Sequence, residues 1–164
     1  MWSLVRHQLE NARLLATHDK RRPRQASLRR AVSTAYYAVF QALSATCADT
    51  LVGWSKPWEA FTPVFRALEH GRAAHTLLQP PLATTPELRR FGLAFRELPE
   101  AREWADYSPE PRPSFEEGTK SSPFTREETL TLIDLAEEAI AILDHLDEDA
   151  RLKLATRLVA RTRK

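Results

Sequence analysis

Residues 31–40 read Ala31-Val-Ser-Thr-Ala-Tyr-Tyr-Ala-Val-Phe40, and they lie inside the strongest helical pattern of the chain. Apolar side chains around them recur at steps of four and three, which places them on one face of an α-helix. Tyr36, Phe40 and Leu43 widen this stripe beyond the seam of a coiled coil. A helix that is apolar over so much of its surface is expected at the centre of a bundle. The seam consists of Leu28, Val32, Ala35, Val39, Ala42 and Thr46.

Toward the amino terminus, another helix is predicted over about residues 2–17. Its apolar side chains also step by three and four and form one stripe. A polar break at residues 18–23 separates the two helices. Pro23 suits the first turn of the later helix, where a missing amide proton costs nothing. The stripe consists of Trp2, Val5, Leu9, Ala12 and Ala16.

On the carboxyl side, residues 58–76 are predicted to form one helix that contains Pro63. A start near Phe61 would put this proline in the first turn, where it causes no kink. Three prolines mark residues 77–86 as a loop, and a further helix is predicted from there to about Trp104. Pro99 is a point at which that helix bends or divides. Its inward-facing side chains are Leu88, Phe91, Phe95 and Leu98.

Residues 107–124 contain four prolines and several small polar residues, and they are predicted to be irregular. Thr125 and Glu128 then form a capping box, in which each side chain satisfies a free amide at a helix start. Asp147 is expected to cap a short final helix through Arg161, followed by a basic tail. The helix between them has a clean seam of Leu132, Ala136, Ala139, Leu143 and Leu146.

These segments predict one all-α domain over residues 1–164. It is an antiparallel up-and-down bundle of four main helices with one or two short helices. With 43% hydrophobic and 28% charged residues, the chain has the composition of a globular domain.

The composition also bounds the function. Cys47 is the only cysteine, which excludes an intrachain disulfide. No stretch reaches the roughly 18 to 20 apolar residues that cross a bilayer, and the amino terminus lacks the features of a secretory signal, so the expected location is the cytoplasm. His70 and His75 are five residues apart, which does not suit two metal ligands on one helical face. Four glycines leave no room for a glycine-rich phosphate loop, and no cofactor is predicted.

Two motifs resemble one family. Ser33-x-x-Tyr36-Tyr37-Ala38 is followed by Arg102-x-x-Ala105-Asp106-Tyr107, and then by a helix rich in Glu and Ala at residues 125–143. In this order the features resemble the HEPN superfamily of small helical bundles, over most of the chain. Many HEPN proteins are metal-independent ribonucleases that act as homodimers in toxin–antitoxin, defence or stress-response systems. Their signature is an arginine followed, after four to six residues, by a histidine that acts as general acid or base.

Arg102 matches the arginine of this signature, but Tyr107 stands where the histidine would be, and no histidine follows before His145. A phenol with a pKa of about 10 is a poor base at neutral pH. The segment from Arg13 to His18 matches the spacing by count, but in a different helix. The resemblance therefore implies a homodimer that binds RNA or a nucleotide, with an antitoxin or other protein as a further partner, rather than an active nuclease.

The resemblance assigns the phosphate contact to Arg102, with Asp106 and Tyr107 shaping the site and Ser33 and Tyr37 lining it. A structural interpretation is also open. Arg102 would pair with Asp106 one turn away, and Tyr107 would bury its ring and use its hydroxyl to tether the following loop.

A basic cluster precedes and enters the central helix. Cations at a helix amino terminus oppose the macrodipole, so the arrangement is locally unfavourable. The cluster therefore indicates a binding site for a phosphate backbone or an acidic partner. The alternative is that these residues form a solvated turn. A different class of function remains alongside RNA or nucleotide binding, namely a non-catalytic interaction module that docks a partner protein. The cluster consists of Lys20, Arg21, Arg22, Arg24, Arg29 and Arg30.

Overall fold

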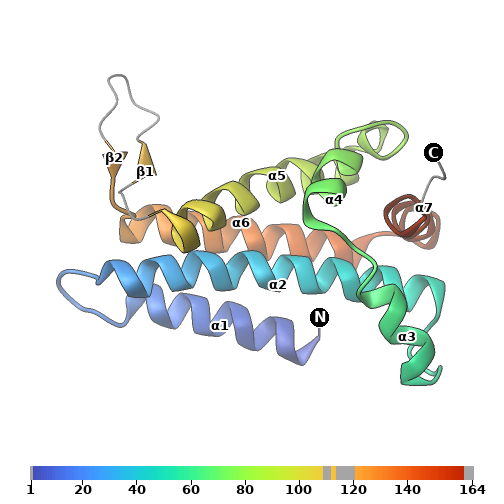
Figure 1. Ribbon diagram of the computed structural model, residues 1–164, viewed down its shortest axis with the longest axis horizontal. Coiled ribbons are helices and arrows are strands. Elements are labelled where there is room, and N and C mark those ends of the chain that lie inside the picture. Colours follow the sequence, from blue (N-terminus) through green and yellow to red (C-terminus); the bar gives the residue numbers. More distant parts are fainter. Residues whose placement is uncertain (1, 109–111, 114–120, 161–164) are drawn as a thin grey trace.

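The computed structural model describes residues 2–108, 112–113 and 121–160, with only the backbone at residues 112–113 and 121–122. Within these residues, four long helices form the body of the molecule (Figure 1). Successive long helices run in opposite directions, as predicted for an up-and-down bundle, and the all-α fold is confirmed. They are α1 (Ser3–Thr17), α2 (Gln25–Leu51), α5 (Pro86–Tyr107) and α6 (Arg126–His145).

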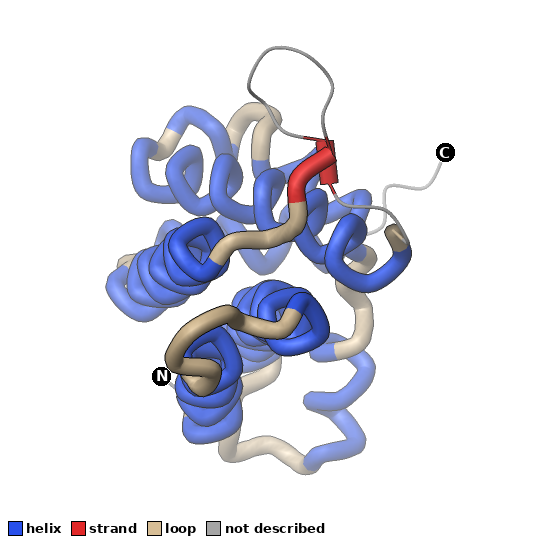
Figure 2. The backbone as a smooth tube through the Cα atoms, turned by 90° about the vertical axis from the view of Figure 1, so that its left-hand side faces the viewer, coloured by secondary structure: helices blue, strands red, loops and turns tan. Residues whose placement is uncertain are grey.

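Shorter elements complete the described part of the chain. A 3-10 turn lies at Leu82–Thr84, and the strands β1 (Arg112–Pro113) and β2 (Ser121–Ser122) pair antiparallel at one end of the bundle (Figure 2). Three short α-helices are present among the described residues, one more than the upper number predicted. They are α3 (Trp58–Phe65), α4 (His70–Leu77) and α7 (Glu148–Val159).

The central position predicted for the helix around residues 31–40 is confirmed. α2 contacts α1, α3, α5, α6 and α7. Its seam side chains Leu28, Val32 and Ala35 have no exposed surface, and Tyr36 is buried among them. Burial of such apolar area is the main favourable term in folding, so α2 is the element around which the bundle is built.

The helix starts follow their local chemistry in α6 and α7. Thr125 Oγ1 accepts from the Glu128 amide at 3.1 Å, and Glu128 Oε2 accepts from the Thr125 amide at 3.0 Å. Asp147 Oδ1 accepts from the Ala150 amide at 2.7 Å. The predicted capping box and the predicted Asp147 cap are both confirmed. α7 ends at Val159, two residues before the predicted end, and the rest of the basic tail lies outside the described residues.

The single helix predicted over residues 58–76 is wrong. The chain forms α3 and α4 instead, separated by residues 66–69. Pro63 lies beyond the first turn of α3, where its missing N–H removes a helical hydrogen bond, and α3 ends two residues later. Leu68 then turns into the core. Pro23 was also misplaced, since α2 begins at Gln25 with Arg24 as its N-cap.

The segment predicted to be irregular, residues 107–124, is only partly so. Tyr107 is the last residue of α5, which runs undivided through Pro99 and three residues beyond its predicted end. β1 and β2 form within the segment, and residues 109–111 and 114–120 lie outside the described part. Phe124 is buried, and its backbone bonds to both ends of the Gln25 amide, which fixes the entry to α6.

Candidate functional site

Two pairs of polar residues with the same spacing meet where α2 packs against α5. Ser33 and Tyr37 stand one turn apart on α2, and Arg102 and Asp106 stand one turn apart on α5. Side chains four residues apart share a helical face, so each pair presents a joint surface to the other helix. The structure brings these four predicted residues into one cluster.

Arg102 is held at the centre of the cluster. Its Nη2 donates to the Tyr37 hydroxyl at 2.7 Å, and its Nε lies 3.1 Å from Oδ2 of Asp106. Nε makes no hydrogen bond within the described residues, so the Asp106 contact is an ion pair alone. Ser33 Oγ donates to the same carboxylate oxygen at 3.1 Å. The Arg102 and Asp106 side chains are 19% and 24% exposed, which leaves the cluster partly open to solvent.

Three tyrosine rings surround the guanidinium. Its central carbon lies 5.1 Å from the ring centre of Tyr107, 5.4 Å from that of Tyr37 and 5.7 Å from that of Tyr36. These distances fall within the range of cation–π attraction. The hydrogen bond to Tyr37 raises the pKa of Arg102 further above its ordinary value, so the group is charged at every physiological pH.

The structural interpretation of these residues is half right. Arg102 pairs with Asp106 as that interpretation expected. Tyr107 does not bury its ring, because 68% of its surface is exposed. It covers the guanidinium instead. The cluster therefore combines a positioned charge with an exposed aromatic face.

His70 and Tyr36 belong to this cluster although neither was a predicted site residue. His70 is the first residue of α4. Its Nδ1 accepts a hydrogen bond from the Tyr36 hydroxyl, and its ring stacks on Phe40 with 3.8 Å between ring centres. Burial raises the pKa of Tyr36 well above its usual range, so the phenol keeps its proton and acts as the donor. Partial burial, followed by the charge of Arg102, lowers the pKa of His70 below 6.5. The imidazole is therefore neutral at pH 7, with its proton on Nε2.

No motif spacing could have found His70. It reaches the cluster only because the chain breaks at residues 66–69 and returns to α2. We refer to Ser33, Tyr37, Arg102, Asp106 and Tyr107, together with Tyr36 and His70, as the Arg102 cluster.

The second match to the arginine–histidine spacing has a structural role. Arg13 lies on α1 and binds two carboxylates of α6, Asp134 at 2.7 Å and Glu137 at 2.8 Å. These contacts join α1 to α6 on the bundle surface. Arg13 is thus engaged away from the Arg102 cluster.

The basic cluster occupies the loop between α1 and α2 and the first turns of α2. Arg24 is partly neutralised by Asp19, whose carboxylate accepts from its backbone amide at 3.1 Å and its Nε at 3.2 Å. Lys20, Arg21, Arg22 and Arg30 are exposed. Arg21 and Arg22 line a concavity of about 410 Å³ with Gln25, Phe124 and Arg126. Along α2, Gln25 lies about two turns, or about 12 Å, from Ser33, so the cations before Gln25 lie apart from the Arg102 cluster, whereas Arg30 lies only three residues from Ser33.

A groove adjoins the Arg102 cluster on the α4 side. It has a volume of about 320 Å³ and shares Tyr37 and His70 with the cluster. We call it the α2–α4 groove. Its lining residues are Tyr37, Phe40, Gln41, Ser44, Phe65, Arg66, Leu68 and His70.

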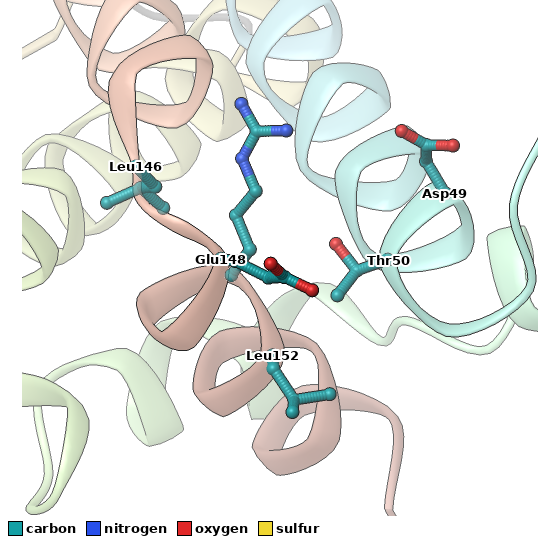
Figure 3. Close-up of a pocket in the computed structure, with 6 residues that line it drawn as sticks. Asp49, Thr50, Leu146, Glu148 and Leu152 are labelled. Carbon is teal, nitrogen blue, oxygen red and sulfur yellow. The ribbon is translucent and has the colours of Figure 1, made fainter.

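Another pocket, of about 350 Å³, lies between the end of α2 and the start of α7 (Figure 3). Asp49 and Glu148 both line it, with Thr50 and Arg151. Two carboxylates at one opening disfavour an anionic ligand. This pocket therefore does not suit the phosphate chemistry of the Arg102 cluster.

No family model, curated protein or solved structure matches this chain. Within the described residues, no three His, Cys, Asp or Glu side chains gather into a group able to hold a metal ion. In the same part of the chain, every helix is too short or too polar to cross a bilayer.

Proposed function

We propose that the Arg102 cluster binds the phosphate of an RNA or nucleotide ligand. The observation that carries this proposal is the position of Arg102, a permanently charged group fixed by Tyr37 and Asp106 at a partly open junction of two helices. Guanidinium groups prefer phosphate and carboxylate partners because their planar donors match those oxygens. Tyr107 adds an exposed ring beside the charge, on which a base can stack.

The resemblance to HEPN proteins supports the same assignment. It rests on two motifs that are 69 residues apart when counted from Ser33 to Arg102, and their polar side chains lie in contact. We extend the proposal accordingly to a cytoplasmic homodimer in a toxin–antitoxin, defence or stress-response setting. Light scattering on the purified chain tests the dimer, which a monomer at all concentrations would exclude.

Asp106 limits the affinity. Its carboxylate repels phosphate while it orients Arg102, so the cluster is close to neutral at pH 7. The exposed cations of the basic cluster, including Arg21 and Arg22, add a long-range attraction that is sensitive to salt. We therefore expect modest affinity that falls as salt rises.

The test compares two methionine variants of α5. Arg102→Met removes the guanidinium and keeps the aliphatic stem, and Arg96→Met removes an exposed arginine of the same helix as the control. Binding of a labelled single-stranded RNA and of AMP is measured at low and high salt. Arg102→Met should weaken binding of at least one ligand about ten- to hundredfold, as expected for a charge-assisted hydrogen bond. Equal affinities of the two variants, or no binding by the wild type at low salt, would overturn the proposal.

We propose binding without cleavage, because Tyr107 stands in place of the motif histidine. Incubation with total RNA in the presence of a chelator tests this point. Intact RNA at high protein concentration is expected. Cleavage that disappears in His70→Asn would contradict the proposal and assign the base to His70 instead.

An interaction module is the second candidate, and an exposed aromatic surface favours it. Trp54 and Trp58 are 48% and 61% exposed, and both stack on Phe61. Exposed apolar patches of this kind mark protein interaction sites. The interaction module becomes the favoured function if the wild type binds neither RNA nor AMP.

A further inference from the structure

The α2–α4 groove contains a buried polar group without a partner. Ser44 is 1% exposed, and its hydroxyl makes no hydrogen bond with any described residue. Other hydroxyls of α2 behave differently, since Thr46 and Thr50 donate to the carbonyls of Ala42 and Thr46 at 2.9 and 2.7 Å. A buried polar group left unpaired is costly and calls for an explanation.

The walls of the groove are mainly apolar and aromatic. Phe40, Phe65 and Leu68 supply apolar surface, and the ring of Tyr37 lies on the side toward Arg102. Gln41 adds an amide and Arg66 a guanidinium to the same lining. Apolar surface with a few polar groups is typical of sites for small organic ligands. Flat rings that carry hydrogen-bonding edges suit such walls best, because they offer both a face to stack and an edge to pair.

The groove and the phosphate site are contiguous. Tyr37 lines the groove and accepts the hydrogen bond from Arg102, and His70 lines the groove beside the guanidinium. A ligand that spans both places has a phosphate at one end and a planar apolar group at the other. The volume of about 320 Å³ is at the lower end for small-molecule sites, which fits one such ring system.

We infer that the α2–α4 groove is the base site for a single nucleotide whose phosphate lies on Arg102. This inference rests on the proposed function and narrows its ligand from RNA or nucleotide to a single nucleoside monophosphate. Ser44 pairs with a polar atom of the base, and Gln41 reads its edge, as glutamine does with bases elsewhere. Phe40 and Phe65 contact its faces.

The experiment uses three kinds of probe in calorimetric titrations of the full chain. The first is each of the common ribonucleoside 5′-monophosphates, the second is ribose 5-phosphate, which lacks the base, and the third is the matching nucleoside, which lacks the phosphate. At least one monophosphate should bind about tenfold or more tightly than ribose 5-phosphate. Equal affinity of the monophosphates and ribose 5-phosphate would overturn the base site while leaving the Arg102 phosphate site intact.

Two groove variants make the test specific. Ser44→Ala removes the unpaired hydroxyl and should leave the melting temperature equal or higher, because no hydrogen bond is lost. Ser44→Ala should weaken binding of the preferred monophosphate several-fold and leave the affinity for ribose 5-phosphate unchanged. Gln41→Ala should have the same two effects on binding. Thr50→Ser, on the same helix but outside the groove, is the matched control.

The outcomes separate the two proposals. Unchanged monophosphate affinity in both groove variants would overturn the base site. Binding of RNA without any monophosphate would overturn the base site and keep the phosphate site. Monophosphate binding that needs Ser44 but not Arg102 would support the groove and overturn the phosphate assignment.

Discussion

Replacing Arg102 with methionine should lower the free energy of unfolding by about 2 to 3 kcal/mol. The hydrogen bond to Tyr37 is the largest contribution, because a charged donor at 2.7 Å is worth about 1.5 kcal/mol even at a partly exposed site. The ion pair with Asp106 adds about 0.5 kcal/mol. Cation–π contacts with the rings of Tyr37 and Tyr107 supply the rest, at about 0.5 kcal/mol each.

The assay is urea unfolding followed by circular dichroism, with Arg96→Met as the control. The control should change the unfolding free energy by no more than about 0.5 kcal/mol, as exposed substitutions usually do. For Arg102→Met the expected loss corresponds to a decrease of about 5 to 10 °C in melting temperature for a chain of this size. A typical domain has about 5 to 15 kcal/mol of stability, so the variant stays folded and its ligand binding can be measured. A change no larger than that of the control would refute the contacts on which both the stability and the binding arguments rest.

Three further predictions test other parts of the structure. The folded pKa of His70 lies below its unfolded value of 6.5, so its neutral form stabilises the protein above that pH, and this stability is lost as the pH falls through the folded pKa. The urea midpoint of the wild type should therefore fall more steeply between about pH 7 and 5 than that of His70→Asn. Parallel curves of the midpoint against pH would contradict the assignment. Burial raises the pKa of the Cys47 thiol to about 12, so a disulfide reagent should label it only in urea, and rapid labelling of the native protein would show that the core is open. Thr125→Ala should destabilise the protein by about 1 kcal/mol in urea unfolding and Thr125→Ser much less, since serine keeps the capping oxygen; equal losses would exclude the capping box as the cause.

Periodicity predicted the long helices because each one buries apolar side chains at helical spacing. The seam of α2 apart from Thr46 and the stripe of α1 apart from Trp2 are buried as their spacing indicates, and these two residues are half-buried. The capping box predicted the residue at which α6 begins, since Thr125 and Glu128 act locally and need no tertiary partner. Where local chemistry and burial agree, a sequence carries enough information to place an element.

The division between α3 and α4 shows the opposite case. Residues 66–69 read Arg-Ala-Leu-Glu, all of them good helix formers, so no propensity signals a break. The helix ends because Pro63 removes a hydrogen bond inside α3 and because Leu68 is drawn into the core. Tertiary burial overrides local preference here, and that override depends on the position of α2.

The same break determines the chemistry of the candidate site. The HEPN resemblance directs attention to a histidine shortly after Arg102 on the same helix, where this chain has Tyr107. The structure supplies an imidazole from another direction, because His70 begins α4 only after the chain has left α3. Chemistry depends on which groups meet in space and not on their order in the chain. The Tyr36 hydroxyl occupies Nδ1 of His70, and the pKa of the ring is lowered, so at neutral pH its Nε2–H is a neutral donor beside the Arg102 charge. A phosphate on Arg102 would draw a proton to this ring, because an anion favours the charged imidazolium. Ligand binding should therefore strengthen as the pH falls below 7 in the wild type, and His70→Asn should lose this dependence.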